Sequence, residues 1–240
     1  LSQTLGAWTA AEQGAMFFRN IANENTTSSR HLIIHEIMGR NCGWLTAKTA
    51  MQYRLRLKKR NFIPELLISK RRWDIHAIYI PEVPIDIDLE IKRLKNIMDK
   101  EDCVNIFLSE GAGIKNIVKD MTSRGKQVLK DAFGHIRLDE VNPGKWLAEK
   151  ISDKIDAEKV LVQKSGYFCR SAAPNNEDLK LIKNTAKYAV NAAMDKKNGV
   201  IGLDNCENFK CISFDEIRGG KPFDINVTWF NQMLEDIGQI

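Results

Sequence analysis

A strand, a glycine turn and a helix follow one another between residues 32 and 59, and this stretch constrains the fold most. The apolar, β-branched run Leu32–Ile37 is typical of a buried strand. The pattern stops at Gly39, and from Trp44 to about Lys59 it becomes helical. Such a turn can direct backbone amides and a helix N-terminus towards an anion, and the guanidinium of Arg40 could bind a phosphoryl group there. Most strand-to-helix turns bind nothing, so the spacing alone leaves both interpretations open.

Strands and helices continue to alternate along the rest of the chain. Short strands are predicted at Ala77–Ile80, Val104–Leu108, Val160–Val162, Gly199–Gly202 and Cys211–Phe214. Helices are predicted over Trp8–Asn23, from Asp86 or Asp88 to about Lys100, from Pro143 onwards, from Asn175 or Asn176 to about Lys196, and over Val227–Ile237. Residues 62–72 have no clean period and are expected to be irregular or a short helix. The alternation predicts the α/β class, with mostly parallel sheets flanked by helices.

Composition limits the function classes that fit this chain. Its 240 residues suit one large domain or two small ones, and 43% hydrophobic residues provide ample core. The net charge of +5 is partly concentrated in basic residues at 54–60 and 70–72. We interpret these as a solvated surface, with an anionic small molecule or a neighbouring subunit as the alternative. Nucleic acid is disfavoured because no aromatic-interleaved platform accompanies the charges.

The cysteines and histidines form no metal or disulfide pattern. The five cysteines include no CxxC pair, and an odd count fits a reducing cytoplasm. Cys206 and Cys211 are too widely spaced for a convincing zinc site. His35 lies within the predicted strand and is expected to be a packed, hydrogen-bonded core histidine. No run approaches the ~20 apolar residues of a membrane span, so we expect a soluble, cytoplasmic protein without membrane contact.

Four segments resemble one known family. The sequence Met38–Trp44 resembles the sugar-phosphate motif of the 6-phosphofructokinase family, and its final tryptophan is more typical of the pyrophosphate-dependent branch. Leu5–Ala10 resembles the helix after the catalytic loop, Ser109–Ala112 the acidic motif, and Gly166–Ser171 the segment that closes over the fructose ring. The resemblance runs from about residue 2 to residue 224. It implies a phosphofructokinase-like α/β fold.

The resemblance also implies roles for individual residues. It assigns contacts with the sugar phosphate to Met38, Gly39 and Glu110, and to the pair Tyr167 and Arg170. Without the family, a Tyr-x-x-Arg pair is more often a surface contact, and a glutamate at a strand end is as often a neighbour of a helix cap. Arg40 is implied to contact the sugar or the transferred phosphoryl group.

The implied activity is a phosphotransfer of glycolysis. Fructose 6-phosphate and pyrophosphate would become fructose 1,6-bisphosphate and phosphate with Mg²⁺, in a homo-oligomer of two or four subunits. An ATP-dependent relative is the close alternative, and a non-catalytic, truncated sugar-phosphate-binding protein is the alternative from another class. The family's glycine-rich, aspartate-containing turn and its Thr-Ile-Asp-Asn-Asp loop occur nowhere in the sequence. No catalytic base or metal ligand is therefore assigned, and the chain resembles the C-terminal portion of a longer enzyme.

The family's two-domain plan predicts how the chain divides. Residues 1–165 are expected to form a sugar-phosphate-binding α/β domain, and residues 166–240 to return to an incomplete phosphoryl-donor domain with an exposed sheet edge. Relatives carry a basic residue where this chain has Leu161, while Lys164 lies three positions later. Whether Lys164, Arg30 or His31 contacts the substrate phosphate is left open.

Overall fold

A parallel sheet forms the centre of the protein. The computed structural model describes residues 3–63, 65, 69–125, 128–129, 134, 136–137, 141–204, 208–217 and 220–240. Within these residues the larger sheet has four strands in the order β2-β3-β1-β4. They are β1 (His31–Ile37), β2 (Ala77–Tyr79), β3 (Cys103–Ser109) and β4 (Lys159–Lys164). Every pair of neighbours is parallel, which confirms the predicted class.

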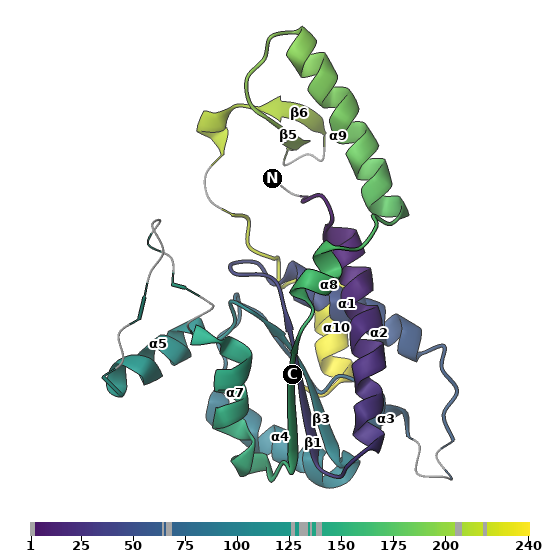
Figure 1. Cartoon of the computed structure of the whole chain (residues 1–240), viewed down its shortest axis with the longest axis vertical. Coiled ribbons are helices and arrows are strands. Elements are labelled where there is room, and N and C mark those ends of the chain that lie inside the picture. The colour runs from purple at the N-terminus through teal and green to yellow at the C-terminus, as the bar shows by residue number, and fades with distance from the viewer. Residues whose placement is uncertain are drawn as a thin grey trace.

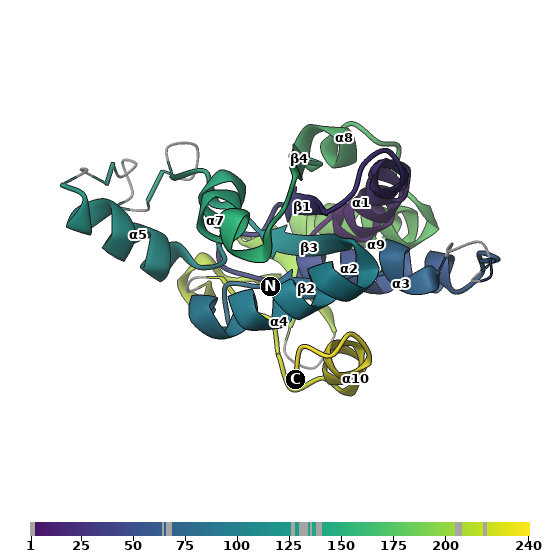
Figure 2. The same ribbon diagram turned by 90° about the horizontal axis from the view of Figure 1, so that it is seen from below.

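Helices cover both faces of this sheet, as the end-on view in Figure 2 shows. One face carries α1 (Ala7–Ile21), α2 (Trp44–Leu57) and α10 (Thr228–Asp236), and the other α4 (Ile87–Glu101) and α7 (Pro143–Ile151). The apolar residues of β1 are divided between the two cores, Ile33 and Ile37 in one and Leu32 and Ile34 in the other, and all seven residues of the strand are buried. The remaining helices are α3 (Lys70–Trp73), α5 (Ile114–Ser123), α8 (Gly166–Arg170) and α9 (Asn176–Met194), with short 3₁₀ turns at Ala22–Thr26, Asp153–Ile155 and Phe214–Glu216.

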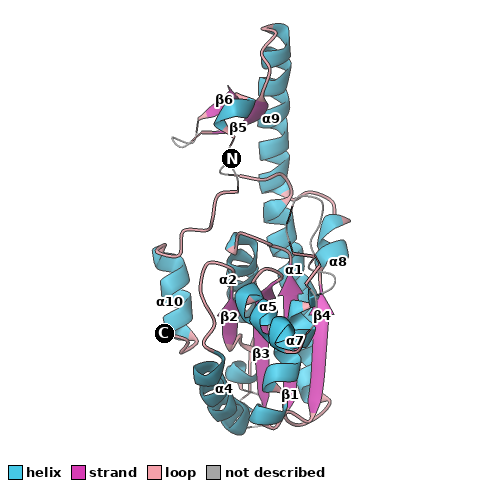
Figure 3. Ribbon diagram, turned by 90° about the vertical axis from the view of Figure 1, so that its left-hand side faces the viewer, coloured by secondary structure: helices cyan, strands magenta, loops and turns pink. Residues whose placement is uncertain are grey.

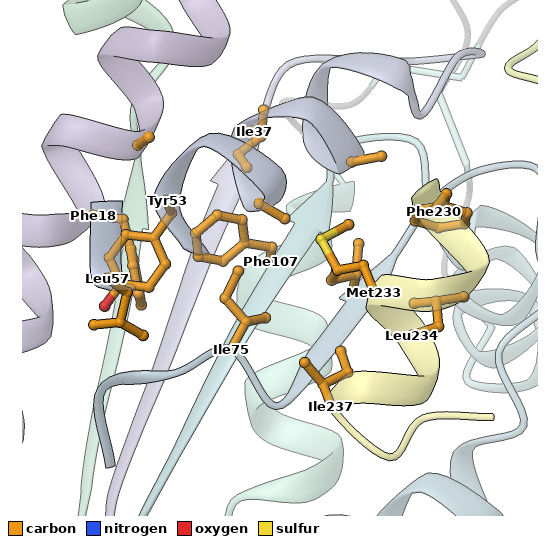
Figure 4. Packing of buried hydrophobic residues seen from close by; sticks show 14 of the residues in the cluster. Phe18, Ile37, Tyr53, Leu57, Ile75, Phe107, Phe230, Met233, Leu234 and Ile237 are labelled. Atoms are coloured by element: carbon orange, nitrogen blue, oxygen red, sulfur yellow. The ribbon is translucent and has the colours of Figure 1, made fainter. Parts of the chain in front are cut away.

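Aromatic rings fill the core between α1, α2 and the sheet (Figure 4). Phe18 packs edge-on against Phe107 and Tyr53, with ring centroids 4.6 and 4.8 Å apart. The ring of His35 stacks on Phe18 at 5.6 Å. Its Nε2 lies 2.8 Å from the hydroxyl of Ser165, so the expectation of a packed, hydrogen-bonded core histidine is confirmed.

The C-terminal segment returns to the same core. Phe230, Met233 and other apolar side chains of α10 pack beside the sheet (Figure 4). The side-chain amide of Gln239 accepts from the backbone N–H of Ile78 and donates to its carbonyl, so it pairs with the outer edge of β2. The predicted boundary at residue 165 stays a prediction.

The helix α9 projects away from the sheet and carries a second, small sheet (Figures 1 and 3). This sheet pairs β5 (Val200–Leu203) with β6 (Phe209–Ile212) in antiparallel orientation. The predicted strand Cys211–Phe214 is therefore two residues too late. The stacking of Phe209 on Tyr188 of α9, at 5.2 Å, explains the earlier start, since it draws Phe209 into the packed strand.

A buried carboxylate fastens α9 to α1. Asp178 accepts hydrogen bonds from the backbone N–H groups of Gly6 and Thr9, at 2.9 and 2.7 Å. The hydroxyl of Thr9 donates to the same carboxylate. These donors lie at the start of α1, where backbone N–H groups have no partner within the helix. Asp178 thus caps a helix that lies 169 residues earlier in the chain.

Candidate sugar-phosphate site

Three parallel strands end at the same edge of the sheet, and a cavity lies there. β1 leads into residues 38–43, β3 into residues 110–113 and β4 into α8. Ligands of open α/β sheets bind at such carboxyl ends. The cavity has a volume of about 260 Å³ and is lined by Glu36, Ile37, Met38, Glu110, Lys164, Gly166, Tyr167 and Arg170. The structure thus brings together Met38, Glu110, Tyr167 and Arg170, which the sequence placed in three separate motifs.

A second cavity adjoins the first and shares Met38 and Arg170 with it. Its volume is about 470 Å³, and the starts of α1 and α2 form much of its wall. Gly39 lies in this second cavity. Arg40 is in the lining of neither; its backbone packs tightly against Gly111 instead.

The glycine turn binds carboxylates of the protein itself. Gly39 has a φ of 144°, which favours glycine, and its N–H donates to Oε1 of Glu110 at 3.1 Å. The N–H of Gly43, at the start of α2, donates to both carboxylate oxygens of Glu82 at 2.9 and 3.0 Å. In this structure the amides of Gly39 and Gly43 thus have carboxylate partners within the protein, and the contact of Gly39 with a sugar phosphate stays a prediction. The groups of the first cavity that could bind a phosphate are side chains, namely those of Lys164, Tyr167 and Arg170.

The charged side chains of the first cavity are held in place by specific contacts. Lys164 forms an ion pair with Glu36 at 2.9 Å, and the second oxygen of Glu36 accepts from the N–H of Gly144, also at 2.9 Å. The Nε of Arg170 lies 3.0 Å from the sulfur of Met38. Tyr167 is 90% exposed, so its phenol projects from the rim. Two cations and a phenol in the lining of one cavity suit a phosphate, while Glu110, which uses Oε1 for Gly39, has a second oxygen that can accept from a hydroxyl.

The structure separates the three basic residues that the sequence left open. Lys164 lines the cavity, at the carboxyl end of β4. Arg30 lies at the opposite end of the sheet, where it binds Asp99 at 3.0 Å and the carbonyl of Ile155 at 2.9 Å. His31 is buried beside it, 3.1 Å from the carbonyl of Glu24. Only Lys164 of the three belongs to this site.

Sequence reasoning missed Glu36 altogether. A signal was present, since Glu36 is a charged residue near the end of an otherwise apolar strand. A buried carboxylate is costly unless it is paired, and Glu36 is 6% exposed with two partners. A carboxylate near the end of an apolar strand therefore predicts a cation or an N–H donor close to that end.

Metal and membrane sites do not stand out in the part of the chain that the structure describes. No three Asp, Glu, His or Cys side chains gather among the described residues in a way that could hold a metal ion. Cys206, weighed above as half of a zinc pair, lies outside them. None of the described helices combines the length and the apolar character of a membrane span.

Comparison with known proteins relates the chain to one family. The family model described as phosphofructokinase matches residues 1–193. The chain is 54% identical to the pyrophosphate--fructose 6-phosphate 1-phosphotransferase of Methylomonas methanica, and 53% identical to that of Methylotuvimicrobium alcaliphilum. Each match covers 100% of this chain and 59% of the relative, so the chain spans somewhat more than half of their length. The crystal structure of a pyrophosphate-dependent phosphofructokinase from Nitrosospira multiformis has the same fold, with a TM-score of 0.58, 17% identity, and coverage of 97% of this chain and 54% of that one.

Proposed function

The chain belongs to the phosphofructokinase family, and from this we propose that it forms the sugar-phosphate-binding part of a phosphotransferase that acts on fructose 6-phosphate. The observation that carries the proposal is the cavity at the strand ends, whose lining combines Arg170, Lys164 and Tyr167 with the carboxylate of Glu110. A phosphorylated sugar needs this combination, because its dianion requires cationic donors while its hydroxyls require acceptors.

Each side chain would make a distinct contribution to binding. Arg170 supplies a planar fork of donors to the phosphate, and Lys164 adds a compact charge. Glu110 uses one oxygen to hold the turn at Gly39, and the other accepts from a sugar hydroxyl. Phosphoryl transfer depends largely on positioning and charge neutralisation. These residues would therefore orient the sugar, and Arg40 would contact the sugar or the transferred group.

Pyrophosphate is the phosphoryl donor that we propose. The support is the 54% and 53% identity to relatives whose names include pyrophosphate, together with Trp44 after the glycine turn. A Mg²⁺ ion would neutralise charge on the phosphates of the donor. The described residues do not fit a magnesium site of their own, so we assign no step to the metal. The catalytic base is expected in the part of the relatives that this chain does not span.

We further propose a glycolytic enzyme of the cytoplasm that acts as a dimer or tetramer. Among the described residues, Cys42, Cys103, Cys169 and Cys211 are free thiols, which suits a reducing compartment. Val190 and Met194 of α9 are 63% and 80% exposed. An apolar surface of this kind fits contact with further polypeptide or with a second subunit.

Replacing Arg170 with alanine is expected to weaken binding of fructose 6-phosphate by about 1–3 kcal/mol, because a charge-assisted contact with the phosphate is lost. Replacing Glu110 with alanine should have a similar effect, through the lost acceptor and the loosened Gly39. Calorimetric titration of the purified chain measures both. The matched control is Arg71→Ala, since Arg71 lies in α3, outside both cavities. An unchanged affinity in the Arg170 variant would refute its role.

The phosphoryl donor is tested by a coupled assay with fructose 6-phosphate, Mg²⁺ and either pyrophosphate or ATP. We expect no turnover with ATP from this chain, because its high-identity relatives are named for pyrophosphate. Turnover with pyrophosphate would support the donor and show that the chain is catalytically sufficient. Turnover with ATP alone would overturn the proposed donor.

A further inference from the structure

The short helix α8 presents two side chains to the cavity but cannot hold its own position. It has five residues, Gly166–Arg170, and carries both Tyr167 and Arg170. An isolated helix of this length is not stable in water, because the unfavourable free energy of helix nucleation exceeds the stabilisation from the hydrogen bonds of one turn. The orientation of these two side chains must therefore come from contacts between α8 and the rest of the protein.

Ser165, the residue before α8, has an unusual hydrogen-bond partner for its side chain. Ser165 occupies the N-cap position, where a serine side chain normally accepts from an N–H of its own helix. Here its side chain makes no capping bond. The hydroxyl instead lies 2.8 Å from Nε2 of His35, in β1, and both residues are almost fully buried. The serine thus ties the start of α8 to the centre of the sheet, and its side chain also contacts the thiol of Cys169 within α8.

The histidine offers a rigid anchor for this bond. Its ring stacks on Phe18 at 5.6 Å with planes 9° apart, and meets Phe107 edge-on at 5.0 Å. The ring of Phe17 lies 5.5 Å from His35 and 5.4 Å from Phe168 of α8, so it packs between strand and helix. Rings on several sides prevent the imidazole from turning away. The backbone adds one weaker link, from Ser165 N–H to the carbonyl of Glu36 at 3.4 Å.

The hydrogen-bonding state of the two ring nitrogens indicates why this position holds a histidine and not an apolar ring. Among the described residues, Nδ1 is buried without a hydrogen-bond partner. A buried polar atom without a partner costs free energy, so an apolar ring would pack here more favourably. The bond from Nε2 to Ser165 is the polar interaction that accounts for the residue. Burial lowers the pKa of His35 to about 3, so the ring stays neutral and the bond persists at neutral pH.

We propose that His35 and Ser165 are a pair of positioning residues that set the orientation of α8, and through it that of Tyr167 and Arg170 towards the sugar phosphate. Neither residue lines the cavity, so the pair acts through α8. The part that concerns the sugar phosphate rests on the proposed function. The part that concerns α8 is independent of it.

Hydrogen exchange of α8 tests the pair without any ligand. The N–H of Cys169 donates to the carbonyl of Ser165, and that of Ser171 to Tyr167. In Ser165→Ala and in His35→Phe, we expect exchange at these two amides to accelerate roughly tenfold, the factor that corresponds to loss of one net hydrogen bond. Ser165→Thr keeps the hydroxyl and should restore protection. The matched control is Asn25→Ala, which removes a buried bond to Asn105 far from the site. Unchanged exchange in Ser165→Ala would overturn the proposal.

A double-mutant cycle tests the link to the ligand. We expect Ser165→Ala to weaken binding of fructose 6-phosphate about tenfold in the wild-type background, and to have little further effect when Arg170 is already alanine. Equal losses in both backgrounds would overturn the action through Arg170. If the wild-type chain binds no fructose 6-phosphate, the proposed function fails, and the exchange experiment still decides whether the pair holds α8.

Discussion

Replacing Gly111 with alanine is expected to abolish measurable binding of fructose 6-phosphate and to lower the free energy of unfolding by about 3 kcal/mol. A Cβ atom at this position would lie 1.8 Å from the carbonyl oxygen of Arg40 and 2.5 Å from its carbonyl carbon. The obstacle is backbone, which cannot rotate away as a side chain can. The segments at 39–40 and 110–113 would have to separate, and the bond from Gly39 to Glu110 would break.

Calorimetric titration and urea unfolding measure the two parts of this prediction. Gly220→Ala is the matched control, because a Cβ there would meet nothing within 4 Å. The control should keep both the affinity and the stability of the wild type. A Gly111→Ala chain with wild-type affinity would show that the close approach of the two turns is not required for the site.

Acidification from pH 7 to pH 5 is expected to lower the free energy of unfolding by about 2 kcal/mol for each of His35 and His76, two of the buried histidines. Burial lowers the pKa of His35 to about 3 and that of His76 to about 4, from an ordinary value of 6.5. In this pH range the unfolded chain binds protons at these residues while the folded chain does not. Stability is therefore complete above the unfolded pKa and falls as the pH drops below 6.5. A hydrogen bond also opposes protonation of His76 in the folded chain. Its Nδ1 accepts from the N–H of Asn105 and cannot do so when protonated.

Urea unfolding at several pH values between 7 and 5 measures this loss. Ion pairs lower the pKa values of Asp99, Asp120 and Asp236 below the ordinary 3.8, so their contributions disappear only at lower pH. The variant His35→Phe should lose about 2 kcal/mol less than the wild type over the same range. A stability that stays constant from pH 7 to pH 5 would contradict the assignment of both histidines as neutral and buried.

Much of the fold could be predicted because its signals are local. The apolar run that ends at Ile37 specified β1, and the start of α2 at Trp44 was correct to the residue. Asp86 and Asn175 cap α4 and α9, as the sequence allowed. The helix α5 was not predicted. Its apolar residues Ile114, Ile117, Val118 and Met121 do carry the helical spacing, so this helix was missed although a local signal was present.

The candidate site could be predicted only in part, because many of its contacts are not local in sequence. Motifs located Met38, Glu110, Tyr167 and Arg170, and the structure places all four around one cavity. The hydrogen bonds that organise this cavity join residues far apart in sequence, such as Ser165 with His35. No local period encodes such pairs. The bonds from Gly39 and Gly43 to glutamates were equally invisible, because each partner comes from another strand end.

Titration of the wild-type chain with fructose 6-phosphate tests the central claim most directly, with fructose and inorganic phosphate as comparison ligands. The cavity offers cationic donors for a phosphate beside an acceptor for hydroxyls, so each comparison ligand satisfies only part of it. We predict that fructose 6-phosphate binds to one site at least tenfold more tightly than either comparison ligand. Equal affinity for fructose 6-phosphate and inorganic phosphate, or no binding of fructose 6-phosphate at all, would contradict the assignment of this cavity as a sugar-phosphate site.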